Sequence, residues 1–307
     1  MSANSTTNSI FDVVAEYQRS LPTSLEKGED IKSIGEHFVN TLRKPEIKDQ
    51  VIEDVQDMKS TAEDIIGTFV TIGVDFAELD GAKVFDSDGN PLQLSEQWHE
   101  YHRRFNEVME KNFDNASRAA SFMQQYSNAI LADIDQLTYY ELSFELKAFF
   151  EKLEHNAAGA LQAKDESTKL VDDIHRFVQI VGAARASMGA CLDDEVGAKG
   201  EAKIQERNRD NSETKAEVQL YKKHQEILAA TKQATANIVR LTAKFDAISG
   251  IWQLFRSDVI QLQKEITLAT DPDMPVTKQL VQRMAISREV YMRLATLLDM
   301  YAKCRAD

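Results

Sequence analysis

Two pairs of side chains have the spacing of a di-metal site in a helical bundle, in which a carboxylate stands three residues before a histidine. The pairs are Glu96 with His99 and Asp172 with His175. Such a site also needs carboxylates that point inward from two further helices. The two most regular apolar repeats of the chain, in residues 51–79 and 238–266, have no carboxylate at their inward positions. We therefore predict no metal site.

Other arrangements fall short of known sites. Residues 86–90 match the start of an EF-hand loop, but Pro91 stands where that loop requires Gly, and Gln97 where it requires Glu. His99 and His102 are one residue too close for the HExxH motif, and no phosphate loop or nucleophile elbow is present. We predict no catalytic residue, no cofactor and no enzymatic activity. The remaining histidines are predicted at the surface: His37, His155 and His224.

The composition predicts few, long helices. Among 307 residues there are only 12 Gly and 5 Pro, which is sparse for a chain with many turns. The formal net charge of −14 repels phosphate backbones, so nucleic acid is not expected as a partner. Cys191 and Cys304 lie far apart and have no metal-ligand spacing.

The most regular helix is expected over residues 238–266, where apolar residues recur at alternating steps of three and four. On a helix this spacing places them on one face: Ile238, Leu241, Phe245, Ile248, Trp252, Phe255, Val259, Leu262 and Ile266. A second repeat of this kind follows Pro45 and runs through Val51, Val55, Met58, Ala62, Ile65, Phe69, Ile72, Phe76 and Leu79. These two helices are natural packing partners because each has a continuous apolar face.

The remaining periodicity predicts three more long helices. Ser95 is expected to cap a helix whose apolar stripe begins at Trp98 and continues to Phe144 and Ala148. A break near residues 156–159 separates it from a helix that contains Leu170 and Ile174, and a last helix covers residues 280–301. We predict an all-α fold, an elongated bundle of about five long antiparallel helices with a short hairpin or loop near residues 83–94. Residues 1–44 are expected to form short helices that pack on the bundle of residues 45–307.

One segment of this bundle is weakly polar. Residues 177–192 contain a single charge, Arg185, and many small residues, and they precede a chain reversal. This tip, near residues 177–200, suits a segment that can leave its site and contact a membrane. The candidate contact residues are Phe177, Val178, Ile180, Val181, Met188, Cys191 and Leu192. The other uncharged segment, residues 65–74, is expected to pack in the core.

The pattern resembles the α-helical pore-forming toxins of the cytolysin A and haemolysin BL type. The resemblance covers residues 46–303 and rests on the long antiparallel helices, the weakly polar tip and residues 245–259, which are similar to a Trp-centred helix of that family. It implies a protein that exposes an apolar head at a membrane and assembles into a ring. The head of typical members is more hydrophobic than residues 177–192, which favours one component of a multi-part toxin.

We therefore expect a membrane-interacting protein, a pore-forming toxin or a toxin component, with membrane lipid and a second component or further copies of itself as partners. Residues 1–9 lack the basic and apolar order of a signal peptide. The protein is expected to be cytoplasmic or secreted without a cleavable signal, and to associate with membranes after activation. The alternative is a cytosolic helical scaffold or interaction protein without membrane activity.

Overall fold

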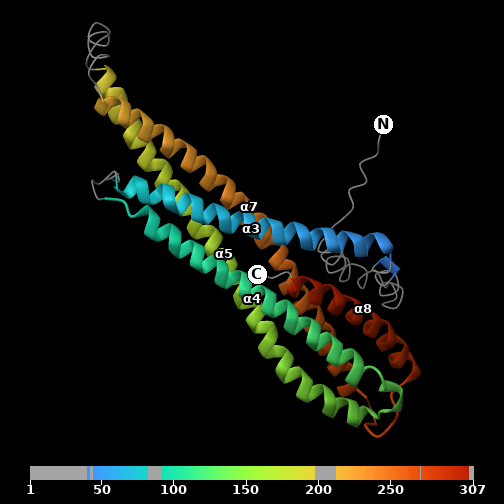
Figure 1. The fold of residues 1–307 in the computed structure, drawn as a ribbon. Helices are drawn as coiled ribbons and strands as arrows, with labels where there is room; N and C mark the ends of the chain where they lie inside the picture. Colours follow the sequence, from blue (N-terminus) through green and yellow to red (C-terminus); the bar gives the residue numbers. More distant parts are fainter. Residues whose placement is uncertain (1–39, 42–43, 82–90, 198–211, 270, 304–307) are drawn as a thin grey trace. The chain divides into compact units, whose positions relative to one another are not determined.

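The computed structural model describes residues 40–41, 44–81, 91–269 and 271–303, except for 198–211. The described chain forms five α-helices and no β-strand (Figure 1). These helices are α3 (Pro45–Gly81), α4 (Leu94–Gln125), α5 (Tyr139–Gly197), α7 (Ser212–Thr267) and α8 (Lys278–Ala302). The all-α prediction is confirmed. The predicted N-terminal helices lie outside the described residues, as does most of the predicted hairpin at residues 83–94.

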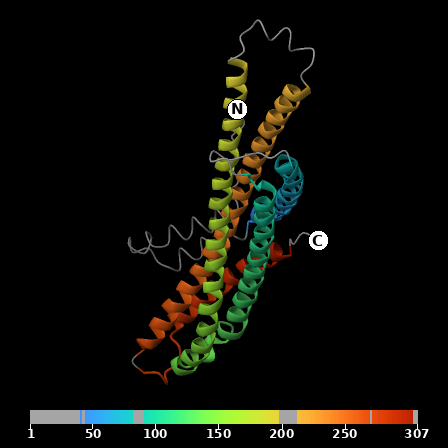
Figure 2. The same cartoon turned by 90° about the vertical axis from the view of Figure 1, so that its left-hand side faces the viewer.

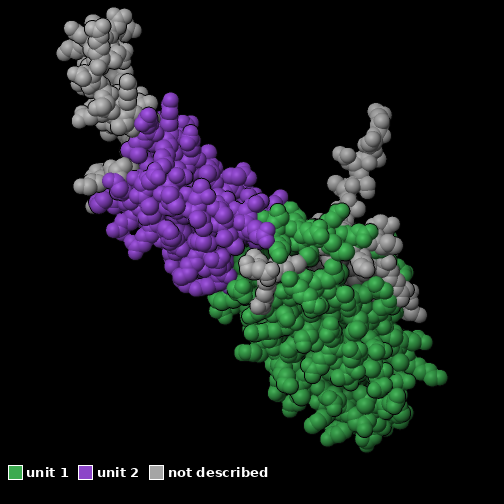
Figure 3. Space-filling view, in the orientation of Figure 1, with its two compact units in different colours: residues 1–60, 108–166, 242–307 green, residues 61–107, 167–241 purple. Residues whose placement is uncertain are grey.

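The chain divides into two compact units (Figure 3). Unit 1 contains Met1–Ser60, Val108–Glu166 and Thr242–Asp307, and unit 2 contains Thr61–Glu107 and Ser167–Leu241. Helices α3, α4, α5 and α7 each contribute residues to both units, whereas α8 belongs to unit 1. This division therefore cuts across helices. The predicted boundary between residues 44 and 45 stays a prediction, because residues 1–39 lie outside the described residues.

The apolar stripe of α7 is buried along its whole length. All nine residues predicted on its inner face, from Ile238 to Ile266, are at most 5% exposed. The α3 stripe is likewise buried from Met58 to Leu79, and Val55 is half-buried. A heptad repeat of apolar residues thus identified the core faces of both helices because each turn of the helix returns the same face to the core.

The predicted helix through residues 95–148 is interrupted, which corrects its C-terminal part. α4 ends in one π-helical turn, Tyr126–Ile130, followed by a short 3-10 helix, Ile134–Gln136. α5 then starts from a capping box, in which the Thr138 N–H donates to Glu141 Oε2 (2.9 Å) and the Glu141 N–H donates to Thr138 Oγ1 (3.2 Å). The break shifts the phase of the stripe, so Phe144 and Ala148 are exposed.

The predicted break at residues 156–159 is wrong, because α5 continues through it. The small residues there serve close packing in unit 1. Ala157 and Ala160 are buried, and a Cβ on Gly159 would lie 4.0 Å from Asn115 Oδ1. Alanine is also the strongest helix former, so a run of Ala with one Gly does not end a well-packed helix.

The turn between α7 and α8 lies against the start of α5 in unit 1. Residues Thr138 and Pro275 form an isolated antiparallel bridge, and the Val276 N–H donates to the Leu137 carbonyl (3.1 Å). Thr277 caps α8 by accepting a hydrogen bond from the Leu280 N–H (3.4 Å).

Candidate functional site

Two of the predicted contact residues, Phe177 and Val181, are fully buried in unit 2. The Phe177 ring lies among aromatic side chains of α3 and α4, with centroid distances of 5.2 Å to Phe76, 5.7 Å to Trp98 and 5.4 Å to Tyr101. Edge-to-face and offset ring pairs at these distances are favourable. The N-terminal part of the weakly polar segment is therefore anchored in an aromatic cluster.

Backbone contacts hold this cluster together. The Trp98 indole N–H donates to the Phe69 carbonyl (2.9 Å) in α3. Gly73 lies at this contact, and a Cβ there would be in ordinary van der Waals contact, 3.6 Å from Trp98 Cδ1 and 3.4 Å from His99 Cε1. The Asp80 carboxylate accepts hydrogen bonds from the Leu94 and Ser95 N–H groups, both at 2.9 Å. Asp80 therefore caps α4, where a cap by Ser95 was expected.

His224 of α7 is fully buried, so its predicted surface position is wrong. Its Nε2 lies 2.9 Å from the Val181 carbonyl oxygen, which accepts the hydrogen bond and joins α7 to α5. The neighbouring Lys223 forms ion pairs with Asp75 (3.3 Å) and Glu78 of α3. The hydrogen bond to Glu78 is the main reason that the pKa of Lys223 is raised.

The other predicted contact residues extend away from this cluster. Val178 is half-buried and Ile180 is 42% exposed. Met188, Cys191 and Leu192 lie in α5, but their side chains are outside the described residues. In unit 2, the end of α5 and the start of α7 extend past the ends of α3 and α4 as a two-helix hairpin (Figures 1 and 2). The segment 177–192 thus begins in a four-helix core and continues into the part of α5 for which α7 is the neighbouring described helix.

The two acid–histidine pairs do not form clusters. Glu96, His99, Asp172 and His175 are all exposed, and His99 Nδ1 lies 2.6 Å from the carbonyl oxygen of Ser95. Within the described part of the chain, no group of three or more His, Cys, Asp or Glu side chains could hold a metal ion. No described helix combines the length and the low polarity that crossing a bilayer requires.

His102 has a different environment from His99. Its ring stacks on Phe69, with the centroids 5.0 Å apart, and its Nε2 is buried without a hydrogen-bond partner in the described structure. Burial, with a smaller contribution from His99, lowers the pKa of His102. The sequence alone does not predict the lowered pKa of His102, because the burial of His102 depends on the contact between α3 and α4.

Residues 65–74 were expected to pack in the core, but the outer face of this segment of α3 is exposed. Val70 and Val74 are one turn apart and both are exposed, on the side of α3 opposite to its buried stripe. No charged residue occurs from Ile65 to Val74, and the Thr71 hydroxyl is bonded to the Gly67 carbonyl (3.0 Å). This face of unit 2 is thus apolar although it is accessible to solvent.

Comparison of the chain with protein-family models and with curated protein sequences finds no match.

Proposed function

We propose that this chain is an α-helical membrane-interacting protein, a pore-forming toxin or one component of a multi-part toxin. Its contact region is the end of the α5–α7 hairpin, with residues 177–192 facing the lipid. One observation carries the proposal: the weakly polar segment of α5 continues beyond the four-helix core of unit 2, where α7 is the one described helix that accompanies it. A helix that faces water on most sides normally carries many charges.

The buried part of the segment explains how it is held in the water-soluble form. Phe177, Val181 and Ala184 occupy the core of unit 2, at spacings of four and three. Beyond Ala184, a two-helix hairpin has fewer neighbours against which to bury an apolar face. We attribute the low charge of residues 186–192 to lipid contact.

The proposal includes partners and location. Lipid is the direct partner, and further copies of the chain or a second component would complete the assembly. Nucleic acid is disfavoured by the net charge of −14. The protein would be membrane-associated only after activation. We propose no enzymatic activity.

The proposal is tested with a dye on Cys191 and a matched pair of variants. In a Cys304→Ser background, an environment-sensitive dye on Cys191 should shift to an apolar emission when liposomes are added. Ile180→Asp should weaken liposome pelleting, since a charge placed in lipid costs roughly 2 to 3 kcal/mol. The control is Val239→Asp, because Val239 has nearly the same exposure (41% against 42%) in the same unit. It should leave pelleting unchanged.

Unchanged dye emission and no pelleting with neutral, anionic and sterol-containing liposomes would contradict the proposal. The second candidate function, a helical scaffold, is favoured by the exposed apolar face of α3 at Val70 and Val74. It predicts that Val70→Ser with Val74→Ser impairs association with a partner protein, while Ile180→Asp has no effect on it. The two functions therefore respond to different variants.

A further inference from the structure

Unit 1 has a second apolar surface, far in sequence from residues 177–192. Two exposed aromatic side chains, Tyr140 (64%) and Phe144 (69%), lie one turn apart at the start of α5. Met274 (56%) and Leu268 (81%) are exposed in the turn after α7. The backbone bonds described below place Met274 beside the first turn of α5, and we call the side chains of Tyr140, Phe144 and Met274 the Tyr140 surface. Exposed large apolar residues are ordinary when scattered, but a group of this kind marks an interaction site.

The backbone beneath the Tyr140 surface is held by hydrogen bonds. The Tyr140 N–H donates to the Pro272 carbonyl (2.9 Å), and the Tyr139 N–H donates to the Met274 carbonyl (3.2 Å). These bonds place the turn of Met274 directly beside the first turn of α5. Tyr140 and Phe144 share one helix face because they are four residues apart. The exposed rings are thus presented by a structured support.

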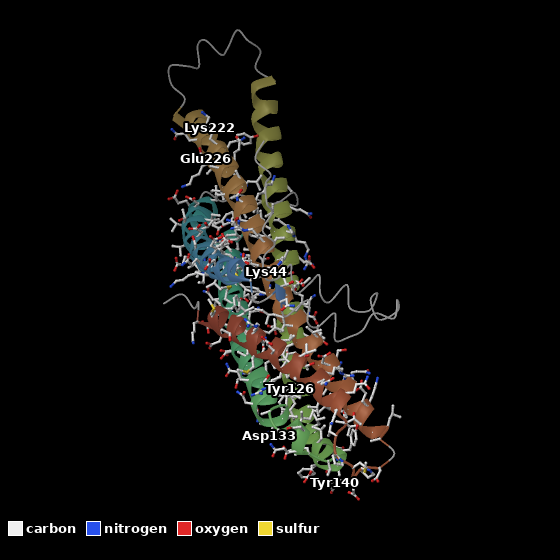
Figure 4. All side chains as sticks on the ribbon, turned by 90° about the vertical axis from the view of Figure 1, so that its right-hand side faces the viewer. Lys44, Tyr126, Asp133, Tyr140, Lys222 and Glu226 are labelled. Atoms are coloured by element: carbon white, nitrogen blue, oxygen red, sulfur yellow. The ribbon has the colours of Figure 1, made fainter. Side chains whose placement is uncertain are left out.

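The surroundings of the Tyr140 surface contain more acidic than basic side chains. Residues 131–145 and 268–277 contain no Lys or Arg, and three exposed lysines lie just outside these ranges: Lys147, Lys264 and Lys278. The acidic residues of the two ranges are all exposed: Asp133, Asp135, Glu141, Glu145, Asp271 and Asp273. Figure 4 shows Asp133 and Tyr140 at the same end of unit 1. An apolar centre with an acidic border is the complement of an apolar side chain flanked by Lys or Arg.

We propose that the Tyr140 surface docks a cationic amphipathic segment of a partner protein. The partner's apolar residues cover Tyr140, Phe144 and Met274, while its Lys or Arg side chains meet the surrounding carboxylates. Anionic lipid is repelled by this border. The acidic border also disfavours a second copy of the chain at this particular surface, because the chain has a net charge of −14. The inference concerns unit 1 alone and does not depend on the membrane function proposed for unit 2.

The test uses a labelled helical peptide of Lys and Leu with its Leu residues on one face, and a Glu and Leu peptide of the same pattern. Fluorescence anisotropy should show binding of the Lys peptide only, weakening with added salt. Tyr140→Ser with Phe144→Ser should weaken binding about tenfold, as expected when aromatic anchors are lost. Val70→Ser with Val74→Ser removes exposed apolar side chains from unit 2 and is the matched control, which should bind normally.

A photoreactive group on the Lys peptide should cross-link to residues 131–145 and 268–277. Equal binding by both double variants, or cross-links elsewhere, would overturn the proposal. So would a dimer in sedimentation that Tyr140→Ser with Phe144→Ser converts to a monomer, because the surface would then bind a second copy. Pelleting with phosphatidylcholine vesicles that needs these two rings would assign it to lipid and overturn it too. Because both rings are exposed, the variants should keep the wild-type circular dichroism.

Discussion

Phe255→Ala should lower the free energy of unfolding of unit 1 by about 3–5 kcal/mol, the usual cost of removing a large buried ring. Phe255 is fully buried in the α7 stripe. Its ring centroid lies 4.8 Å from that of Tyr291, 5.3 Å from Tyr126 and 5.9 Å from Phe149. The substitution therefore leaves a cavity between α4, α5, α7 and α8. Four helices cannot all move to fill it, so the cost should lie in the upper part of the range.

The two tryptophans allow the units to be followed separately. Trp252 lies in unit 1 and Trp98 in unit 2, and both are buried. A Trp98→Phe background makes Trp252 the reporter of unit 1, and Trp252→Phe makes Trp98 the reporter of unit 2. The free energy of unfolding should fall by about 3 kcal/mol per M of urea. Phe255→Ala should therefore lower the urea midpoint reported by Trp252 by about 1 M or more. The exposed Gln253→Ala is the control; an equally small shift for Phe255→Ala would refute the packing described for unit 1.

Three further predictions concern caps and metals. Asp80→Ala should destabilise unit 2 by about 1–2 kcal/mol, measured through Trp98, because it removes the cap of α4, while Ser95→Ala should cost less. Thr277→Ala should destabilise unit 1 by about 1 kcal/mol, measured through Trp252. Thr277→Ser should retain most of the wild-type stability, because its hydroxyl can accept the same hydrogen bond. Added manganese, iron or zinc should leave the melting temperature unchanged; an increase abolished by His99→Ala and His175→Ala would contradict this.

Periodicity predicted the core faces well because burial in a helical bundle repeats with the helix turn. The repeat of α7 also extends further toward the N-terminus of that helix. The buried His224, Ile227, Thr231 and Ala234 continue the stripe of Ile238 backward at steps of three and four. Extending the repeat through Thr231 to His224 would have predicted that His224 is buried. The Thr138–Glu141 capping box is likewise a local signal for the start of α5.

Other features depend on contacts between residues that are distant in the sequence, and the local sequence does not predict them. The Asp80 cap acts on a helix 14 residues further along the chain. The exposure of Tyr140 and Phe144 follows from the phase shift at the π-helical turn, since an uninterrupted helix would have placed Phe144 on the stripe. The candidate membrane segment can be recognised in the sequence by its low charge. The Tyr140 surface can be recognised only in the structure, by the exposure of its side chains.

His102 makes the stability of unit 2 sensitive to acid. Its pKa is held below the usual 6.5, chiefly by burial. A lowered folded-state pKa contributes stability that is complete above pH 6.5 and is lost as the pH falls through the folded value. The urea midpoint reported by Trp98 should therefore decrease as the pH is lowered from 7.5 to 5. His102→Phe keeps a ring on Phe69 but binds no proton, so it should flatten this dependence; an unchanged slope would show that His102 does not titrate as described.

Asp258 gives the stability of unit 1 the opposite dependence on pH. Burial raises the pKa of this carboxyl above the usual 3.8, although the Tyr291 hydroxyl bond and Arg283 act against the shift. Its contribution to stability is complete below pH 3.8 and is lost as the pH rises through the folded value. Mild acid should thus weaken unit 2 through His102 and strengthen unit 1 through Asp258, each by at most about 1.4 kcal/mol per pH unit. Asp258→Asn should remove part of the acid stabilisation reported by Trp252 and leave the Trp98 transition unchanged. If it changes both transitions equally, the two units do not respond to acid separately, and acid cannot selectively loosen the unit that carries residues 177–192.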